Sequence, residues 1–234
     1  MKLLEPIKDH HFERRMFIGR VVFFVIIGYL LGSLPFGLVI GRMSTGIDIR
    51  KYGSGSTGMT NVLRTIGRPA AALVLLLDMG KAILAVTVAQ SFVDSTTIYP
   101  IVGLAAIVGH NWPVFTRFKG GKGTAAGWGA LIALSPLSGL IAGIIGITLI
   151  AIFRYVSLGS IISSVSGGLS LVALSMFGFE PLSYSWYGAI GPVMILFRHL
   201  DNITRLIKGK EPKLGQRLNG YPIEKNNAHK GPKI

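Results

Sequence analysis

Residues 124–153 read TAAGWGALIALSPLSGLIAGIIGITLIAIF and carry no charged side chain. As a single helix this run would be roughly 45 Å long, too long to stand upright in a hydrocarbon core of about 30 Å. Proline interrupts helices, and the pair Ser135-Pro136 lies near the middle of the run. The stretch therefore predicts two consecutive membrane-spanning helices that meet at Pro136.

The rest of the chain has the composition of a membrane protein. Half of the 234 residues are hydrophobic and only 15% are charged, whereas soluble domains run near 25% charged. The absence of cysteine excludes a disulfide framework and a cysteine nucleophile. The net charge of +14 would suit nucleic acid, but in a membrane protein it indicates anionic lipid and orientation, so we expect no nucleic-acid partner. Further apolar runs that predict spans cover residues 21–40, 69–77 together with 82–92, 98–115, 156–179 and 181–197.

The basic residues predict how the spans are oriented. They gather in residues 42–68, 117–122 and 198–234, and short loops rich in lysine and arginine face the cytoplasm. Six spans would place the first and last of these regions on opposite sides of the membrane, whereas the break at Pro136 makes seven and places all three on one side. The predicted fold is an all-α integral membrane protein, a seven-transmembrane helical bundle with its N-terminus outside and its C-terminus cytoplasmic. Basic residues near the N-terminus conflict with this orientation, and a start at Met16 would remove most of the conflict.

One membrane domain is expected. Residues 1–17 form a polar N-terminal extension, 18–215 the seven-span core, and 216–234 a basic C-terminal tail that we expect to be disordered. The connections expected on the outer face are residues 94–97, 135–136 and 178–181.

The first of three polar clusters is GSGSTGMTNVLR at residues 53–64. Its glycines let backbone N–H groups approach an anion, Thr60 and Asn61 can hydrogen-bond, and Arg64 can clamp a phosphate. A flexible connector is the alternative, but it needs no Thr-Asn-x-x-Arg, so we favour a binding loop. The spacing of its glycines also fits the dinucleotide-binding fingerprint. We reject that interpretation because the flanking segments are membrane spans rather than a soluble parallel sheet.

The second cluster is GHNWPVFTRFKGGKGT at residues 109–124. Lys122 lies between two glycines where the next span begins, and a helix N-terminus with a lysine and a glycine approach attracts phosphate. Simple interfacial anchoring would explain the lysines but not the glycines. For His110 we expect a packed, hydrogen-bonded role at a helix end.

The third cluster, RHLDNITRLIKGKEP at residues 198–212, continues the last span. His199 and Asn202 are three residues apart and share a helix face, and Gly209 is placed to cap the helix. A basic helix on anionic lipid is the alternative. Within the second span, Asp78 and Lys81 are also three apart, and ionisable groups in a span indicate either function or a structural ion pair. We include Lys81 among the candidate phosphate-binding residues and leave Asp78 outside the primary set.

Together the clusters resemble the motifs of the bacterial acyl-phosphate-dependent glycerol-3-phosphate acyltransferase family, PlsY. The family's first motif, Ser-x-Asn-x-Gly-x-Thr-Asn-x-x-Arg, is matched except that Ser56 stands at the first Asn. The matching residues are Ser54, Gly58, Thr60, Asn61 and Arg64, then Gly109, His110, Pro113, Phe115 and residues 120–123, then His199, Asn202, Arg205, Gly209 and Glu211. The resemblance covers residues 18–215 and implies a seven-span bundle, in agreement with the charge pattern.

The resemblance implies transfer of a fatty acyl group from acyl phosphate to the sn-1 hydroxyl of glycerol 3-phosphate. The products would be lysophosphatidic acid and phosphate, in the first acylation of phospholipid synthesis. It implies an active site facing the cytoplasm in the bacterial inner membrane, with membrane lipid as a further partner and neither cofactor nor metal. The expected catalytic residues are Ser54, Arg64, Lys122, His199 and Asn202. The expected substrate- or phosphate-binding residues are Ser56, Gly58, Thr60, Asn61, Lys81, Gly120, Gly121, Gly123, Arg205 and Glu211.

An acyl phosphate already carries a good leaving group, so we expect direct attack, with positioning and charge stabilisation as the enzyme's task. His199 and Asn202 would orient the hydroxyl, and the proton would go to His199 or to the departing phosphate. Ser54 is expected to hydrogen-bond, because nothing in the sequence marks a base for it as a nucleophile. A transporter of an organophosphate would use the same basic groups, but no paired repeat is visible. A lipid-binding scaffold would leave the Ser, Thr, Asn and His side chains without a role.

Overall fold

A helix break lies where the sequence predicted one. In the computed structural model, which describes residues 10–216, α6 (Thr124–Leu134) ends one residue before α7 (Pro136–Phe153) begins. The Ser135 backbone N–H donates to the carbonyl of Leu131, and its hydroxyl accepts from the N–H of Ser138, so one residue closes one helix and caps the next. The predicted break at Pro136 is confirmed.

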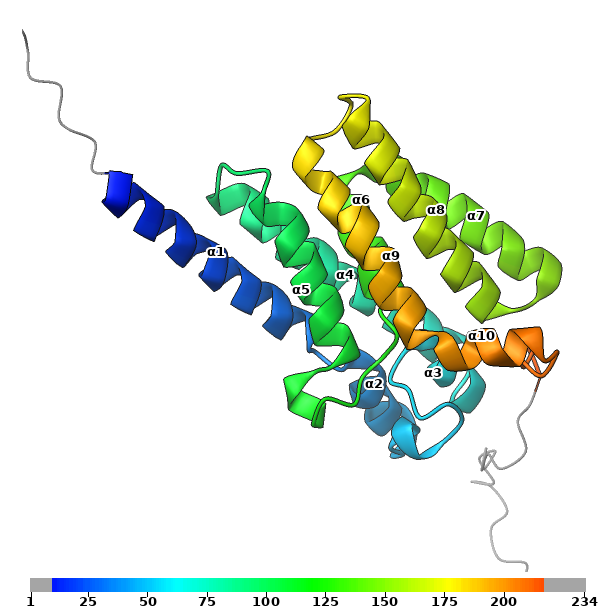
Figure 1. Cartoon of the computed structure of the whole chain (residues 1–234). Coiled ribbons are helices and arrows are strands. Elements are labelled where there is room, and N and C mark those ends of the chain that lie inside the picture. Colours follow the sequence, from blue (N-terminus) through cyan, green and yellow to red (C-terminus); the bar gives the residue numbers. More distant parts are fainter. Residues whose placement is uncertain (1–9, 217–234) are drawn as a thin grey trace, which may run out of the picture.

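Every regular element in the described residues is helical (Figure 1). The other elements are α1 (His10–Gly32), α2 (Phe36–Thr45), η1 (Ile49–Lys51), α3 (Met59–Thr65), α4 (Arg68–Phe92), α5 (Ile98–Asn111), η2 (Val114–Thr116), α8 (Val156–Met176), η3 (Leu182–Tyr184), α9 (Ser185–Arg198) and α10 (Leu200–Ile207). The predicted polar N-terminal extension and basic C-terminal tail fall largely outside the described residues.

Within residues 10–216, five helical stretches are long and apolar enough to cross a membrane. They are Glu13–Thr45, Arg68–Phe92, Ile98–Thr116, Pro136–Phe153 and Val156–Met176. The apolar helix α6 is shorter. Large apolar side chains such as Ile144, Ile152 and Val193 are exposed on the outside of the bundle, as expected for a surface that faces lipid.

A second break was missed by the sequence analysis, which treated residues 21–40 as one uninterrupted span. The structure ends α1 at Gly32 and starts α2 at Phe36. Pro35 supplies no backbone N–H and so cannot continue the helical ladder. The carbonyl of Leu34, at the break, accepts from the N–H of Phe36 at 3.1 Å and from Lys81 Nζ on α4 at 2.8 Å.

The helices pack closely at glycines, as membrane helices do when small residues let their backbones approach. A Cβ on Gly32 would collide with the backbone of Ala106 on α5, and one on Gly129 with the backbone of Met79 on α4. The bundle brings α3, α10 and the segment that precedes α6 to the same end (Figure 1). This end therefore holds all three polar clusters.

The helix contact at Gly129 predicts a stability difference between two glycines. We expect Gly129→Ala to lower the melting temperature in detergent, since overpacking a tight contact costs about 1–3 kcal/mol. Gly80→Ala is the matched control, because a Cβ there meets no atom within 4 Å. Alanine favours helix over glycine, so this control should be neutral or stabilising. Equal melting temperatures for the two variants would contradict the proposed packing.

Candidate active site

A cavity of about 350 Å³ runs from the three polar clusters into the bundle. Eleven of the residues predicted from the sequence line it, namely Ser54, Ser56, Gly58, Thr60, Asn61, Arg64, Lys122, Gly123, His199, Asn202 and Glu211. Four predicted residues do not line it, namely Lys81, Gly120, Gly121 and Arg205. The fold thus gathers side chains from three separate loops around one space.

A chain of hydrogen bonds fixes the polar end of the cavity. The Asn202 amide donates to Glu211 Oε1 over 2.7 Å, and Arg205 Nε donates to Glu211 Oε2 over 2.7 Å. Because a carboxylate only accepts, this bond turns the amide oxygen of Asn202 toward Lys122, whose Nζ donates to it. Glu211 and Arg205 therefore position Asn202, and Asn202 positions Lys122.

The electrostatics of this end favour an anion. Burial, with the cations Arg205 and Arg64 adding to it, lowers the pKa of Lys122 to about 8. The Arg64 guanidinium donates to the carbonyl of Pro212 at 3.4 Å and also lines the cavity. A bound phosphate would relieve the repulsion between these cations, and both residues are well suited to phosphate.

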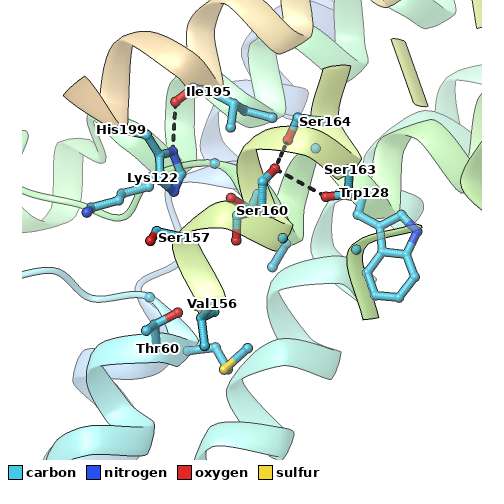
Figure 2. Close-up of a pocket in the computed structure, with 18 of the residues that line it drawn as sticks. Thr60, Lys122, Trp128, Val156, Ser157, Ser160, Ser163, Ser164, Ile195 and His199 are labelled. Carbon is cyan, nitrogen blue, oxygen red and sulfur yellow. Dashed lines mark hydrogen bonds between the residues drawn. The ribbon is translucent and has the colours of Figure 1, made fainter. Parts of the chain in front are cut away.

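His199 lies at the junction of α9 and α10, where it faces the cavity beside Lys122 (Figure 2). Its Nδ1 lies 2.8 Å from the carbonyl oxygen of Ile195. A carbonyl can only accept, so Nδ1 carries the proton, and in the neutral ring Nε2 is left as an acceptor. Burial lowers the pKa of His199 to about 4, which keeps the ring neutral at physiological pH.

Asn61 holds the first loop in shape. Its side-chain nitrogen donates to the carbonyls of Ile49, Tyr52 and Ser56, and its side-chain oxygen accepts from the N–H of Ser54. These bonds use the hydrogen-bonding capacity of the amide inside the loop. Asn61 therefore fixes the shape in which the loop faces the cavity, and both polar atoms of its own side chain are already hydrogen-bonded.

The glycines before Lys122 serve a similar structural purpose. The N–H of Gly121 donates to the carbonyl of His110 at 3.0 Å, and its carbonyl accepts two bonds from the Arg198 guanidinium. A Cβ on Gly121 would collide with His110 Nε2. The left-handed Gly123, with φ of 87°, then starts α6. The loop is thus pinned on both sides, which fixes the backbone that carries Lys122.

Lys81 lies away from the cavity, in a buried group of charges between α4 and α5. Its Nζ contacts Asp78 Oδ1 at 2.7 Å in addition to Leu34, and His110 Nδ1 lies 3.5 Å from the same Asp78 oxygen. Asp78 and His110 line the cavity, although the sequence analysis left the first outside the primary set and gave the second a packing role. The pair Asp78-x-x-Lys81 within a span was the signal that indicated this cluster.

Beyond its polar end the cavity is mainly apolar and is lined by residues of α6, α7, α8 and α9. Sequence analysis missed a face of α8 that carries four serines, at positions 157, 160, 163 and 164 (Figure 2). The hydroxyls of Ser163 and Ser164 donate to the carbonyl of Ser160 on the same helix, which leaves a wall of small side chains. The recurrence of serine at helical spacing in an apolar span was the available signal.

The fold and the site define an integral membrane enzyme in which a cationic polar centre opens into an apolar cavity. A family model described as glycerol-3-phosphate acyltransferase matches residues 22–209. The chain belongs to the glycerol-3-phosphate acyltransferase family, so the resemblance drawn from the motifs is confirmed.

Individual proteins that are similar to this chain carry the same family name. Glycerol-3-phosphate acyltransferase 3 of Dehalococcoides mccartyi is 40% identical, over 86% of this chain and 99% of the relative. The glycerol-3-phosphate acyltransferase of Parasynechococcus marenigrum is 45% identical, over 82% and 88%. The crystal structure of PlsY, an integral membrane glycerol 3-phosphate acyltransferase, in its glycerol 3-phosphate form has a TM-score of 0.77 and 38% identity, over 83% of this chain and 96% of that one.

The bonds of Asn61 predict a graded effect of substitution. Asn61→Asp places a carboxylate against three carbonyl oxygens and should destabilise the protein by about 3 kcal/mol, because buried polar groups then lack donors. Asn61→Ala removes the bonds without adding charge and should cost less. Thermal unfolding in detergent measures both. A melting temperature for Asn61→Asp equal to that of the original chain would refute the structural role.

The lowered pKa of His199 predicts sensitivity to acid. The folded protein resists protonation until pH falls to about 4, whereas an unfolded histidine takes up a proton below about pH 6.5. Stability is therefore lost as pH falls from about 6.5 toward 4, by about 3 kcal/mol in full. Over this pH range the melting temperature should fall less in His199→Gln than in the unmodified chain. If the plot of melting temperature against pH has the same slope in that variant, other groups cause the loss of stability in acid.

Proposed function

We propose that the chain transfers the acyl group of a fatty acyl phosphate to the sn-1 hydroxyl of glycerol 3-phosphate. The hydroxyl oxygen attacks the acyl carbonyl, the bond from that carbon to the phosphate oxygen breaks, and 1-acyl-glycerol 3-phosphate and inorganic phosphate result. The observation that carries the proposal is the single cavity that joins a cationic polar end to an apolar interior. Such a space suits one reactant with a lipid tail and another that is soluble and anionic.

The roles of the polar residues follow from their contacts. Lys122 and Arg64 hold phosphate oxygens and stabilise the charge that develops on the departing phosphate. Asn202, fixed by Glu211, keeps Lys122 in place. Thr60 and the Ser54 loop, both at the cavity, supply further hydrogen bonds to the reactants. No covalent intermediate on the protein is needed, because the acyl phosphate is already activated.

The relative basicity of His199 and the departing phosphate decides which of them accepts the proton. His199, with a pKa of about 4, is a weak base, whereas the second ionisation of a phosphate ester lies near pKa 6. The proton of the attacking hydroxyl therefore goes to the departing phosphate. His199 Nε2 accepts a hydrogen bond from that hydroxyl and orients it for attack.

We also propose seven spans, formed by α1 with α2, then α4, α5, α6, α7, α8 and α9. The polar end faces the cytoplasm of the bacterial inner membrane, and the N-terminus lies outside. Support comes from the basic residues of the segments 42–68, 117–122 and 198–213, which lie at the polar end. Of the seven, α5, α6 and α9, with 14, 11 and 14 residues, are clearly shorter than the roughly 20 residues of a full span.

Purified protein in detergent, given acyl phosphate and labelled glycerol 3-phosphate, should form labelled 1-acyl-glycerol 3-phosphate and release phosphate. Lys122→Met should lower kcat/KM about 10²- to 10³-fold, the size expected when a group that stabilises developing charge is lost. Lys119→Met is the matched control, because Lys119 belongs to the same loop but is exposed and lies outside the cavity.

Three results would overturn the proposal. One is the absence of acylated product with acyl phosphate, another is efficient use of acyl-CoA in its place, and the third is full activity in folded Lys122→Met. Uptake of glycerol 3-phosphate into liposomes without product would indicate a transporter.

A further inference from the structure

The cavity, from its polar mouth to its apolar interior, is long enough for a lipid chain. Its lining residues on α8 extend from Val156 to Gly168, about 18 Å at a rise of 1.5 Å per residue. Its lining on α9 extends over a similar length, from Tyr187 to His199. Apart from Tyr187, the side chains along these walls are mostly small or aliphatic, so the space is a channel with a polar mouth.

Trp128 on α6 lies at the end of the cavity opposite Lys122 and His199 (Figure 2). Two contacts fix its ring there. The indole N–H donates to the carbonyl of Gly139 over 2.8 Å, and a Cβ on Gly143 would come within 2.6 Å of the ring. Both glycines are on α7, so the indole bridges two helices and its rotamer is set by hydrogen bonding and by contact.

The same indole separates the cavity from the lipid. A second depression, on the outer face of α6 and α7, is also lined by Trp128, Gly143 and Ile147. Its remaining lining residues include Leu140 and Ile144, both 58% exposed, on the surface of the bundle. Trp128 is therefore the larger of the two bulky side chains, with Ile147, that line both the channel and the external groove.

We infer that Trp128 is a specificity-determining residue that sets the longest acyl chain the enzyme accepts. The inference rests on the proposed function, because it needs an acyl chain in the channel. That chain comes from the bilayer, which is as apolar as the channel, so apolar transfer by itself distinguishes chain lengths only weakly. Discrimination must come from the space available, and Trp128 closes that space.

Acyl chains short enough to fit the channel should react with similar kcat/KM. Each carbon beyond that length must displace the Trp128 indole or force the acyl chain to bend. Hydrophobic pockets discriminate by about 10- to 200-fold per methylene when the extra group does not fit. The wild-type profile of kcat/KM against chain length should therefore fall steeply past one length. Loss of the indole joins channel and groove, so a longer chain can pass between α6 and α7 into the lipid.

The test measures kcat/KM for a series of saturated acyl phosphates of increasing length, with Trp128→Ala, Trp186→Ala and the unmodified chain in the same detergent. At every acyl length, the kcat/KM of each variant is divided by that of the unmodified protein. This ratio cancels differences in substrate solubility. Trp128→Ala should have a ratio near one for short chains and at least tenfold above one past the limit. Trp186, which is 64% exposed and outside the cavity, is the matched control and should leave the profile unchanged.

A second variant narrows the channel from its other side. Ser160→Leu adds bulk to the lining of α8 and should move the limit to shorter chains. This variant keeps the inference testable if Trp128→Ala fails to fold. Trp128→Phe serves the same purpose, and it should lengthen the longest accepted acyl chain less than Trp128→Ala does.

A ratio that stays constant across all lengths, in folded Trp128→Ala that still transfers acyl groups, would overturn the inference and leave the proposed function intact. An unmodified chain that transfers no acyl group from any acyl phosphate would instead refute the proposed function. A profile unchanged by Ser160→Leu would also count against a channel of limited length.

Discussion

A polar group placed among membrane helices must find its hydrogen bond inside the protein, and much of this structure follows from that constraint. At the helix break around Pro35, the carbonyl of Leu34 accepts from the N–H of Phe36 and from the buried Lys81 of α4. Lys81 is then itself a buried charge, which Asp78 balances. The hydroxyls of Ser163 and Ser164 on α8 bond to their own helix for the same reason. Satisfied polar groups are what allow an apolar cavity to lie next to charged loops.

The same constraint divides the polar residues into those that build the site and those left to act in it. Asn61, Gly121 and Glu211 use their hydrogen bonds to hold loops, and through those loops they hold reactive groups. Lys122 and the free ring nitrogen of His199 remain directed at the cavity. The proposed catalysis by positioning needs both kinds of residue, because a misplaced lysine would stabilise charge poorly.

The sequence predicted the helical class, the break at Pro136 and the meeting of three clusters, because span length, proline and charge act locally and are visible in one dimension. It did not separate structural from reactive residues. An asparagine that shapes a loop and one that positions a lysine look identical until their neighbours are known, as Asn61 and Asn202 demonstrate. The break before Pro35 was missed because the surrounding run is uniformly apolar. Trp128 gave no signal, since its position depends on how α6 packs against α7.

The polar end is completed by the last segment that the structure describes. Arg64 from the first loop bonds the carbonyl of Pro212, and Arg154 and Leu214 exchange backbone and side-chain bonds across the gap between α7 and the tail. Glu211, which orients Asn202, belongs to this segment as well. During synthesis all the membrane helices emerge from the ribosome before it does. The helices can therefore insert and pack in the bilayer while the polar end is still unassembled, and the site is complete only once this segment has followed them.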